Sequence, residues 1–277
     1  MIAAAAFVLF QAASPPAATV TVVRGGVTPR VVCAGDPRFS YALYLPADYV
    51  AGRAWPLLYV FDPRGRGAFA AELFAQAAAA HGFVVASSND TQSDDPKAPN
   101  AAAVTAMWVD THSRLSIDPG RRYAGGFSGT ARVAARLGLS QKGSLAGVLA
   151  VGGRLAEDAR GKEPWPFALY GAAGDDDFNH PEMWELDGLL AKNGTPHRIT
   201  SFEGGHQWMP KEQAMEALDW FALRGRGSAP PPDAAVVDRY RAAVSARAAA
   251  LEAAGRVGEA LRVWEELAED LAGTASA

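Results

Sequence analysis

Residues that could form a nucleophilic site occur along this chain in the order serine, aspartate, histidine. Ser128 lies in the run GGFSGT at 125–130, three aspartates lie in GDDDFN at 174–179, and His206 lies in EGGHQW at 203–208. A serine hydroxyl is a poor nucleophile unless a base takes its proton, and that base needs a carboxylate to orient it. The three groups together are the set that attack on a carbonyl carbon requires.

The serine motif predicts a sharp turn from a strand at 122–127 into a helix at 129–137. On such a turn the serine hydroxyl is pushed out of the sheet, and the next backbone N–H points at the same space. The usual pattern is G-x-S-x-G, and Thr130 stands at its last position, so the match is imperfect. On this motif alone, an ordinary turn or helix N-cap is the more common interpretation, and the rest of the chain must support the catalytic one.

The segments around these motifs alternate between strand and helix patterns. Strands are expected at 41–45, 56–61, 83–86, 122–127, 145–151, 167–172 and 197–202, and helices at 68–81, 101–115, 129–137, 181–192 and 211–224. Alternation at this spacing predicts an α/β fold with βαβ crossovers and a mostly parallel central sheet flanked by helices. The carboxyl ends of parallel strands meet at one edge of the sheet, so the serine, aspartate and histidine motifs are expected to converge there.

The two ends of the chain depart from this alternation. Residues 1–18 form a short apolar, Ala- and Pro-rich leader that is similar to a signal-peptide core, although no Lys or Arg precedes it. It is too short to span a bilayer. A periplasmic or secreted location is favoured on this basis, and a cytoplasmic protein with a disordered leader is the alternative.

The remaining boundaries follow from composition. Residues 19–224 are expected to form the α/β domain, and the Gly-, Ser- and Pro-rich run at 225–232 is expected to be a linker. Residues 233–272 form two helical stretches split at Gly255, and their pattern resembles the second half of a tetratricopeptide repeat. The residues that carry this resemblance are Gly255, Val257, Ala260, Trp264 and Leu267. A lone hairpin leaves an apolar stripe uncovered, so it is expected to dock on the main domain or to mediate self-association.

Composition excludes several classes of function. The formal net charge of −4 gives no electrostatic reason to expect nucleic acid or an anionic membrane as a partner. The single cysteine, Cys33, cannot form an intramolecular disulfide, and the sequence has no Cys/His cluster for a structural zinc ion. No metal and no cofactor are therefore expected.

With these motifs in place, the region from residue 41 to 224 resembles an α/β-hydrolase, and more narrowly the secreted esterase and dienelactone-hydrolase-like branch. The resemblance implies that Ser128 is the nucleophile and that His206 is the catalytic histidine. In this family the acid often lies three residues after a glycine that ends its strand, which places it at Asp177, with Asp176 as the next choice. The alternatives are a solvated acidic turn or, less favoured, a cation site at Asp175–Asp177, and a loop histidine at His206.

The resemblance also implies an oxyanion hole. The Gly129 N–H at the helix start is expected to be the first donor. Many relatives carry His-Gly-Gly after the strand at 56–61, but this chain has DPRG at 62–65, and Pro63 has no N–H. Arg64 N–H is therefore expected to be the second donor, with Gly65 in reserve.

Side chains near these motifs are expected to contribute to substrate binding or to packing. The Arg64 side chain is expected either to meet a substrate carboxylate or to form a surface salt bridge. Trp208 is expected to wall the substrate pocket, and core packing is the favoured role of Trp108. The other histidines are interpreted as structural: His81, His112, His180 and His197.

The leading functional hypothesis is a serine hydrolase that cleaves a small-molecule carboxylic ester through an acyl-enzyme. A peptidase on the same fold is a variant of this hypothesis. The competing hypothesis is a non-catalytic hydrolase-like domain whose helical tail binds a partner. It is motivated by Thr130, by the unusual loop at 62–65 and by the repeat-like tail.

Overall fold

The computed structural model describes residues 21–93, 95, 97–153, 155, 157, 161–224 and 232–272. The expected leader at 1–18 and residues 225–231 of the expected linker lie outside the described residues. No helix in the described ranges is both long and apolar enough to cross a membrane.

The centre of the fold is an eight-stranded sheet with the order β1-β2-β4-β3-β5-β6-β7-β8. The strands are β1 (Val27–Val32), β2 (Ser40–Tyr44), β3 (Trp55–Phe61), β4 (Val84–Ser88), β5 (Ile117–Phe127), β6 (Gly147–Val151), β7 (Ala168–Gly174) and β8 (His197–Phe202). The strand β2 runs antiparallel to β1 and β4, and all pairs from β4 to β8 are parallel. The predicted mostly parallel sheet is confirmed.

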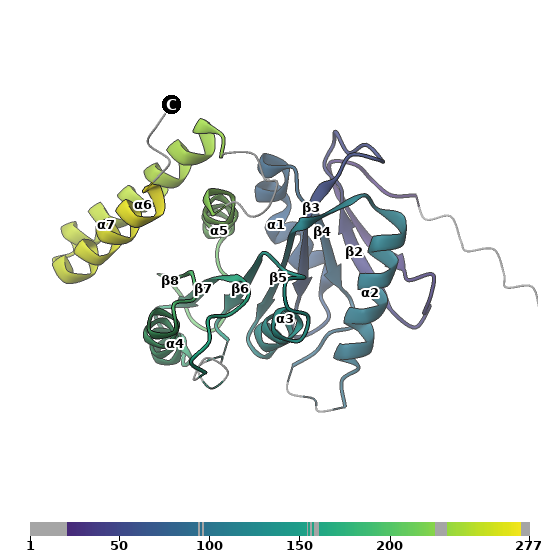
Figure 1. Ribbon diagram of the computed structural model, residues 1–277, viewed down its shortest axis with the longest axis horizontal. Coiled ribbons are helices and arrows are strands. Elements are labelled where there is room, and N and C mark those ends of the chain that lie inside the picture. The colour runs from purple at the N-terminus through teal and green to yellow at the C-terminus, as the bar shows by residue number, and fades with distance from the viewer. Residues whose placement is uncertain are drawn as a thin grey trace, which may run out of the picture.

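Helices cover both faces of this sheet (Figure 1). They are α1 (Gly67–His81), α2 (Asn100–Arg114), α3 (Gly129–Ser140), α4 (His180–Asn193), α5 (Lys211–Leu223), α6 (Ala234–Ala253) and α7 (Val257–Leu271). Buried residues of α2, α3 and α4 share one apolar core with the sheet, and those of α1 and α5 share the other. The three-layer arrangement directs the carboxyl ends of the parallel strands to one edge.

Local sequence explains where most of these elements begin and end. All seven residues of β3 are buried, as its continuous apolar run predicts for a strand covered on both faces. The helix α1 ends at Gly82, which takes the left-handed conformation with φ +66°. The strand β5 begins at Ile117 rather than at the expected residue 122, because pairing with β3 resumes across a register irregularity that accommodates the turn residues Pro119 and Gly120.

The C-terminal hairpin of α6 and α7 docks on the α/β domain of the same chain (Figure 1). Tyr240 and Val244 of α6, with Val263 and Leu267 of α7, join the apolar core that α5 shares with the sheet. The expected apolar stripe of α7 is only partly covered. Its exposed members are Val257, Leu261 and Trp264.

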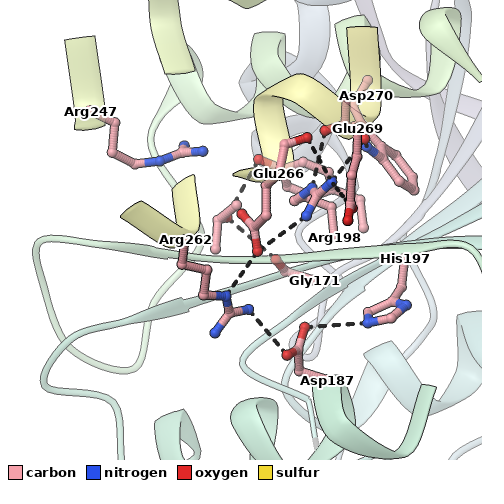
Figure 2. Close-up of polar contacts among 12 residues, drawn as sticks. Gly171, Asp187, His197, Arg198, Arg247, Arg262, Glu266, Glu269 and Asp270 are labelled. Carbon is pink, nitrogen blue, oxygen red and sulfur yellow. Dashed lines mark hydrogen bonds and ion pairs between the residues drawn. The ribbon is translucent and has the colours of Figure 1, made fainter. Parts of the chain in front are cut away.

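A buried ion cluster fastens the hairpin to the edge strand β8 (Figure 2). Arg198 of β8 lies 2.9 Å from Asp270 and 3.1 Å from Glu266, both on α7. Asp270 also accepts hydrogen bonds from Trp220 and Arg224, at 3.0 and 2.7 Å. Burial alone would raise the pKa of Asp270, but the hydrogen bonds and charge of Arg198 outweigh it and hold the pKa below its ordinary value.

Replacing Asp270 by alanine is expected to destabilise the fold by about 3–5 kcal/mol, because it leaves the buried Arg198 guanidinium without its closest partner. Glu269→Ala is the matched control, since Glu269 lies 3.9 Å from Arg198 and its side chain is 74% exposed. Urea titrations at neutral pH measure both effects.

The pH dependence of the stability difference between wild type and Asp270→Ala gives a second measurement. A carboxylate whose pKa is lowered on folding stabilises the fold above its ordinary pKa and loses that effect as pH falls through the folded value. The gap between wild type and Asp270→Ala should therefore shrink below about pH 4. Equal destabilisation by the two variants would show that the ion cluster does not fasten the hairpin.

Candidate active site

Ser128 lies at the sharp turn between β5 and α3. Its φ is +56°, and it is the only residue other than glycine with a positive φ in the described part of the chain. Such a conformation costs about 1–3 kcal/mol and persists only where the surroundings impose it. The Ser128 N–H donates to Val151 O of β6 at 2.8 Å, which holds the turn in place.

Two glycines of the motif are required by close packing. A Cβ at position 126 would lie 2.3 Å from Thr130 O, and one at position 129 would lie 2.6 Å from the Cβ of Ser93. The first glycine lets the helix approach the strand, and the second lets the Ser93 loop approach the helix start.

Thr130, the departure from the usual motif, is fully buried and hydrogen-bonded. Its Oγ1 lies 2.6 Å from Phe61 O and 2.7 Å from Phe127 O, and its single hydrogen can be donated to either. Phe127 N–H donates to the same oxygen at 3.3 Å. The hydroxyl therefore ties the serine turn to the end of β3, a link that the glycine of the usual motif cannot make.

Thr130→Val is expected to lower kcat/KM for ester hydrolysis by about tenfold, because a buried carbonyl that loses its partner costs about 1–3 kcal/mol and the serine turn shifts in response. Thr130→Ser keeps the hydroxyl and is expected to retain activity. Steady-state kinetics of the two variants test this. If the serine variant is as impaired as the valine variant, packing of the methyl group, and not the hydroxyl, is what matters.

The structure brings Ser128, His206 and Asp177 together at the carboxyl ends of β5, β8 and β7. His206 Nε2 lies 2.9 Å from Ser128 Oγ. His206 Nδ1 lies 2.9 Å from both carboxylate oxygens of Asp177. This geometry allows the imidazole to accept the serine proton while the carboxylate orients the ring.

Of the three neighbouring aspartates, Asp177 is the one that contacts His206. Its side chain is fully buried, whereas Asp175 and Asp176 are exposed. Asn179, which the sequence analysis missed, donates its N–H to Asp177 Oδ1 at 2.8 Å and its side-chain amide to Gly152 O at 2.9 Å. The D-x-N spacing of an Asx turn is the signal that could have indicated it.

The His206 ring lies between two aromatic side chains. The ring centroid of Phe127 is 4.6 Å from that of His206, and the centroid of Phe178 is 4.3 Å away. Phe178 remains 74% exposed. These contacts restrict rotation of the imidazole, and the sequence pattern gave no sign of Phe178.

The backbone N–H groups expected to form an oxyanion hole are not equally free to bind a substrate oxygen. Within the described residues no backbone carbonyl accepts the Gly129 N–H, which stands at the start of α3. Arg64 N–H instead donates to Asp62 Oδ1 at 2.9 Å, and Gly65 N–H donates to Asp62 O at 3.2 Å. Both N–H groups therefore already have an acceptor, and a role for either of them in an oxyanion hole stays a prediction.

Asp62 is the buried centre of the loop after β3. It accepts hydrogen bonds from the Arg66 guanidinium at 2.8 Å and from Trp208 Nε1 at 2.9 Å. Burial alone would raise the pKa of Asp62, but the Arg66 and Trp208 hydrogen bonds outweigh it and lower the pKa. The loop after β3 is thereby joined to the segment that carries His206.

A cleft of about 330 Å³ opens above the serine. Its walls are Pro63, Arg64, Arg66, Phe69, Ser93, Phe127, Ser128, His206, Gln207 and Trp208. Trp208 is only 7% exposed and packs on Phe74 and Phe127, so it presents one edge to the cleft. The exposed Arg64 side chain makes no ion pair with any other described residue.

The other histidines lie away from this cleft. His81 pairs with Asp219 at 2.7 Å and His197 with Asp187 at 3.3 Å, and the remaining two lie against tryptophans. Trp108 stacks on Tyr59 and packs against the core. No cluster of potential metal ligands occurs in the described ranges.

Comparison with known proteins gives a structural likeness without a sequence match. No family model matches the chain, and no curated protein matches its sequence. Among solved structures, a ferulic acid esterase shares 15% identity at a TM-score of 0.53, covering 66% of this chain and 91% of its own. An S-formylglutathione hydrolase of Staphylococcus aureus shares 13% identity at a TM-score of 0.55, covering 66% of this chain and 90% of its own.

A third structure is Thermogutta terrifontis esterase 2, phosphorylated by paraoxon. It shares 15% identity at a TM-score of 0.55, covering 67% of this chain and 88% of its own. Together with the strand order and the layers of helices, these likenesses show that the chain has the α/β-hydrolase fold.

Proposed function

We propose that this α/β-hydrolase-fold protein is a serine esterase that cleaves a small-molecule carboxylic ester through an acyl-enzyme. One observation carries the proposal: the continuous hydrogen-bond chain from Ser128 through His206 to the buried Asp177. The fold neighbours support the ester class, since two of them are named as esterases and one as an S-formylglutathione hydrolase.

In the acylation step, Ser128 Oγ attacks the carbonyl carbon of the ester, and His206 Nε2 takes the serine proton. The carbonyl oxygen becomes an oxyanion that the Gly129 N–H stabilises at the helix start. Collapse of the tetrahedral intermediate breaks the bond to the alcohol, which leaves with the proton from His206 and gives the acyl-Ser128 ester.

Deacylation repeats these steps with water as the nucleophile. His206 takes a proton from the water, the hydroxide attacks the acyl carbon, and the proton returns to Ser128 Oγ as the carboxylic acid departs. Asp177 holds the imidazole in the required orientation throughout and stabilises the imidazolium that forms in each half-reaction.

The strained serine turn argues for catalysis over the non-catalytic alternative. Ser128 is held at φ +56° although an unstrained residue would stabilise a purely structural turn. Thr130, which motivated that alternative, is accommodated by its hydrogen bonds to the ends of β3 and β5. A location outside the cytoplasm stays a prediction.

Rapid mixing with p-nitrophenyl acetate tests the proposal. An acyl-enzyme mechanism is expected to give a burst of p-nitrophenol with an amplitude close to the enzyme concentration whenever deacylation is the slower step. Peptide p-nitroanilides tested in parallel separate the peptidase variant. No ester turnover alongside measurable anilide cleavage would replace the esterase by a peptidase, and inactivity on both would remove the proposed function.

A further inference from the structure

A second cavity, of about 390 Å³, lies away from the serine cleft, between β8 and the C-terminal hairpin. Five consecutive residues, 199–203, line its sheet side, together with Asp175 after β7 and Trp184 of α4. Successive side chains of a strand point to opposite faces of a sheet. Five in a row can line one cavity only if the cavity runs along the backbone edge of the strand. We call this cavity the β8 groove.

The edge of β8 in the groove is not paired within the sheet. β8 is the last strand of the sheet and pairs only with β7. Leu169 N–H donates to Pro196 O and Asp175 N–H donates to Phe202 O, so the even-numbered residues direct their backbone groups toward β7. The N–H and C=O groups of Ile199, Ser201 and Glu203 therefore point out of the sheet.

None of those outward groups has a hydrogen-bond partner among the described residues. Open backbone groups along a strand are a template for pairing with another extended chain. In most folds such an edge is blunted by charge or covered directly. Here the hairpin packs near the edge of β8 but leaves the cavity of about 390 Å³ between them.

The wall opposite β8 is built from one face of each hairpin helix. The helix α6 and its C-cap contribute residues 247, 250, 251 and 254, and α7 contributes residues 259, 262, 263 and 266. Both sets have the i, i+3, i+4, i+7 spacing of a single helical face. At the other end of β8, Arg198 ties α7 to the strand, and Arg262 of α7 reaches past the strand edge to Asp187 of α4 at 3.1 Å, so ion pairs anchor the hairpin at that end of the groove (Figure 2).

Some of the charged side chains that line the groove form ion pairs, and others do not. Arg247 pairs with Glu216 at 2.7 Å, Arg256 with Glu259 at 2.6 Å, and Arg262 with both Asp187 and Glu266. Two carboxylates remain where β8 ends. Glu203 has no ion-pair partner in the described ranges, and Asp175 lies 4.0 Å from His180 and interacts by charge with Arg256, which is itself paired with Glu259. This end of the groove therefore favours a basic group.

We propose that the β8 groove binds an extended peptide segment of a partner protein, which adds to the open edge of β8 as a further strand. Its backbone pairs with the outward N–H and C=O groups of Ile199, Ser201 and Glu203. Apolar side chains pack toward Leu251 and Val263 in the opposite wall, and a Lys or Arg meets Asp175 and Glu203.

The site is placed to influence the catalytic loops. Glu203 lies three residues before His206, and Asp175 lies two residues before Asp177. A strand added beside β8 orders the segment that carries the histidine, so peptide binding is expected to change the rate of ester hydrolysis. The binding itself does not depend on Ser128, and its test can succeed or fail separately from the proposed esterase activity.

Ser201 offers a substitution specific to the open edge. Ser201→Pro removes the outward N–H and leaves the ladder with β7 intact, because proline is tolerated on an edge strand where its nitrogen faces outward. Ser201→Ala is the matched control, since both variants lose the hydroxyl bonded to His180 but only the proline variant loses the N–H. A second pair of variants lies on α6. Ala250→Trp places a large side chain in the groove, and Ala249→Trp is its control, because Ala249 is exposed and does not line the groove.

The probe is a phage-displayed random nonapeptide library selected on the immobilised full chain, followed by fluorescence anisotropy with the synthetic peptides recovered. We expect peptides with alternating apolar residues and a Lys or Arg, at least tenfold weaker binding to Ser201→Pro and Ala250→Trp, and unchanged binding to both controls. Thermal melts report whether each variant is folded; if the proline variant is not, the tryptophan pair decides.

Three outcomes overturn the proposal. They are recovery of no peptide from the library, equal binding of the peptides to the wild type and to Ala250→Trp, and loss of binding by Ala249→Trp together with Ala250→Trp. If the purified chain is instead a dimer in light scattering that Ala250→Trp dissociates, the groove is occupied by a second copy, and the peptide assignment is wrong.

Discussion

Replacing Ser128 by alanine is expected to lower kcat for p-nitrophenyl esters by roughly 10⁵–10⁶-fold, the scale seen when the nucleophile of a serine hydrolase is removed. The reason is chemical, because alanine cannot form the acyl intermediate and the remaining groups can only bind the ester. Ser128 is partly exposed at the cleft, so loss of its hydroxyl leaves no buried cavity and the fold is expected to survive. Steady-state kinetics with a melting curve for each protein measure the effect.

Ser93→Ala is the control for this substitution, because Ser93 lines the same cleft and packs against Gly129. It is expected to keep most of the activity. A Ser128→Ala enzyme that retains the wild-type rate, or a Ser93→Ala enzyme that loses as much, would take Ser128 out of the mechanism.

Asp177→Asn is expected to lower kcat by about 10⁴-fold, because an amide that donates a hydrogen bond to His206 stabilises the wrong tautomer of the imidazole. The substitution conserves volume at a buried site, and the Asn179 N–H can still donate to the remaining side-chain oxygen. KM is expected to change little, since Asp177 does not line the cleft.

Asp175→Asn is the matched control for Asp177→Asn. Asp175 lies two residues away at the end of the same strand, but its side chain is 43% exposed and does not contact His206. Its substitution should leave kcat nearly unchanged. If Asp175→Asn is instead the more damaging of the two, the hydrogen bond between Asp177 and His206 is not the one that operates in catalysis.

The main features of the fold followed from the sequence because they depend on local pattern. The buried run of β3 and the left-handed Gly82 at the end of α1 are specified by residues within each segment. The order of the Ser128, Asp177 and His206 motifs was enough to place them at one edge, since parallel strands end on the same side.

Contacts between segments that are distant in the chain could not be predicted from the sequence. The engagement of Arg64 N–H depends on how the Asp62 carboxylate turns back, and that carboxylate is fixed by Trp208, 146 residues away. Which members of the apolar stripe of α7 are buried could not be predicted for the same reason. Periodicity identifies an apolar stripe, but only packing on α5 and β8 decides that Leu267 is buried and Leu261 is exposed.

The central claim is that His206 and Asp177 activate Ser128, and covalent labelling with a fluorophosphonate probe tests it most directly, because only an activated serine reacts quickly. Mass spectrometry of the labelled and digested protein should place one adduct per chain on the peptide that contains Ser128, with slow labelling of Asp177→Asn. No adduct on the folded wild-type protein, or an adduct on a different serine, would contradict the account.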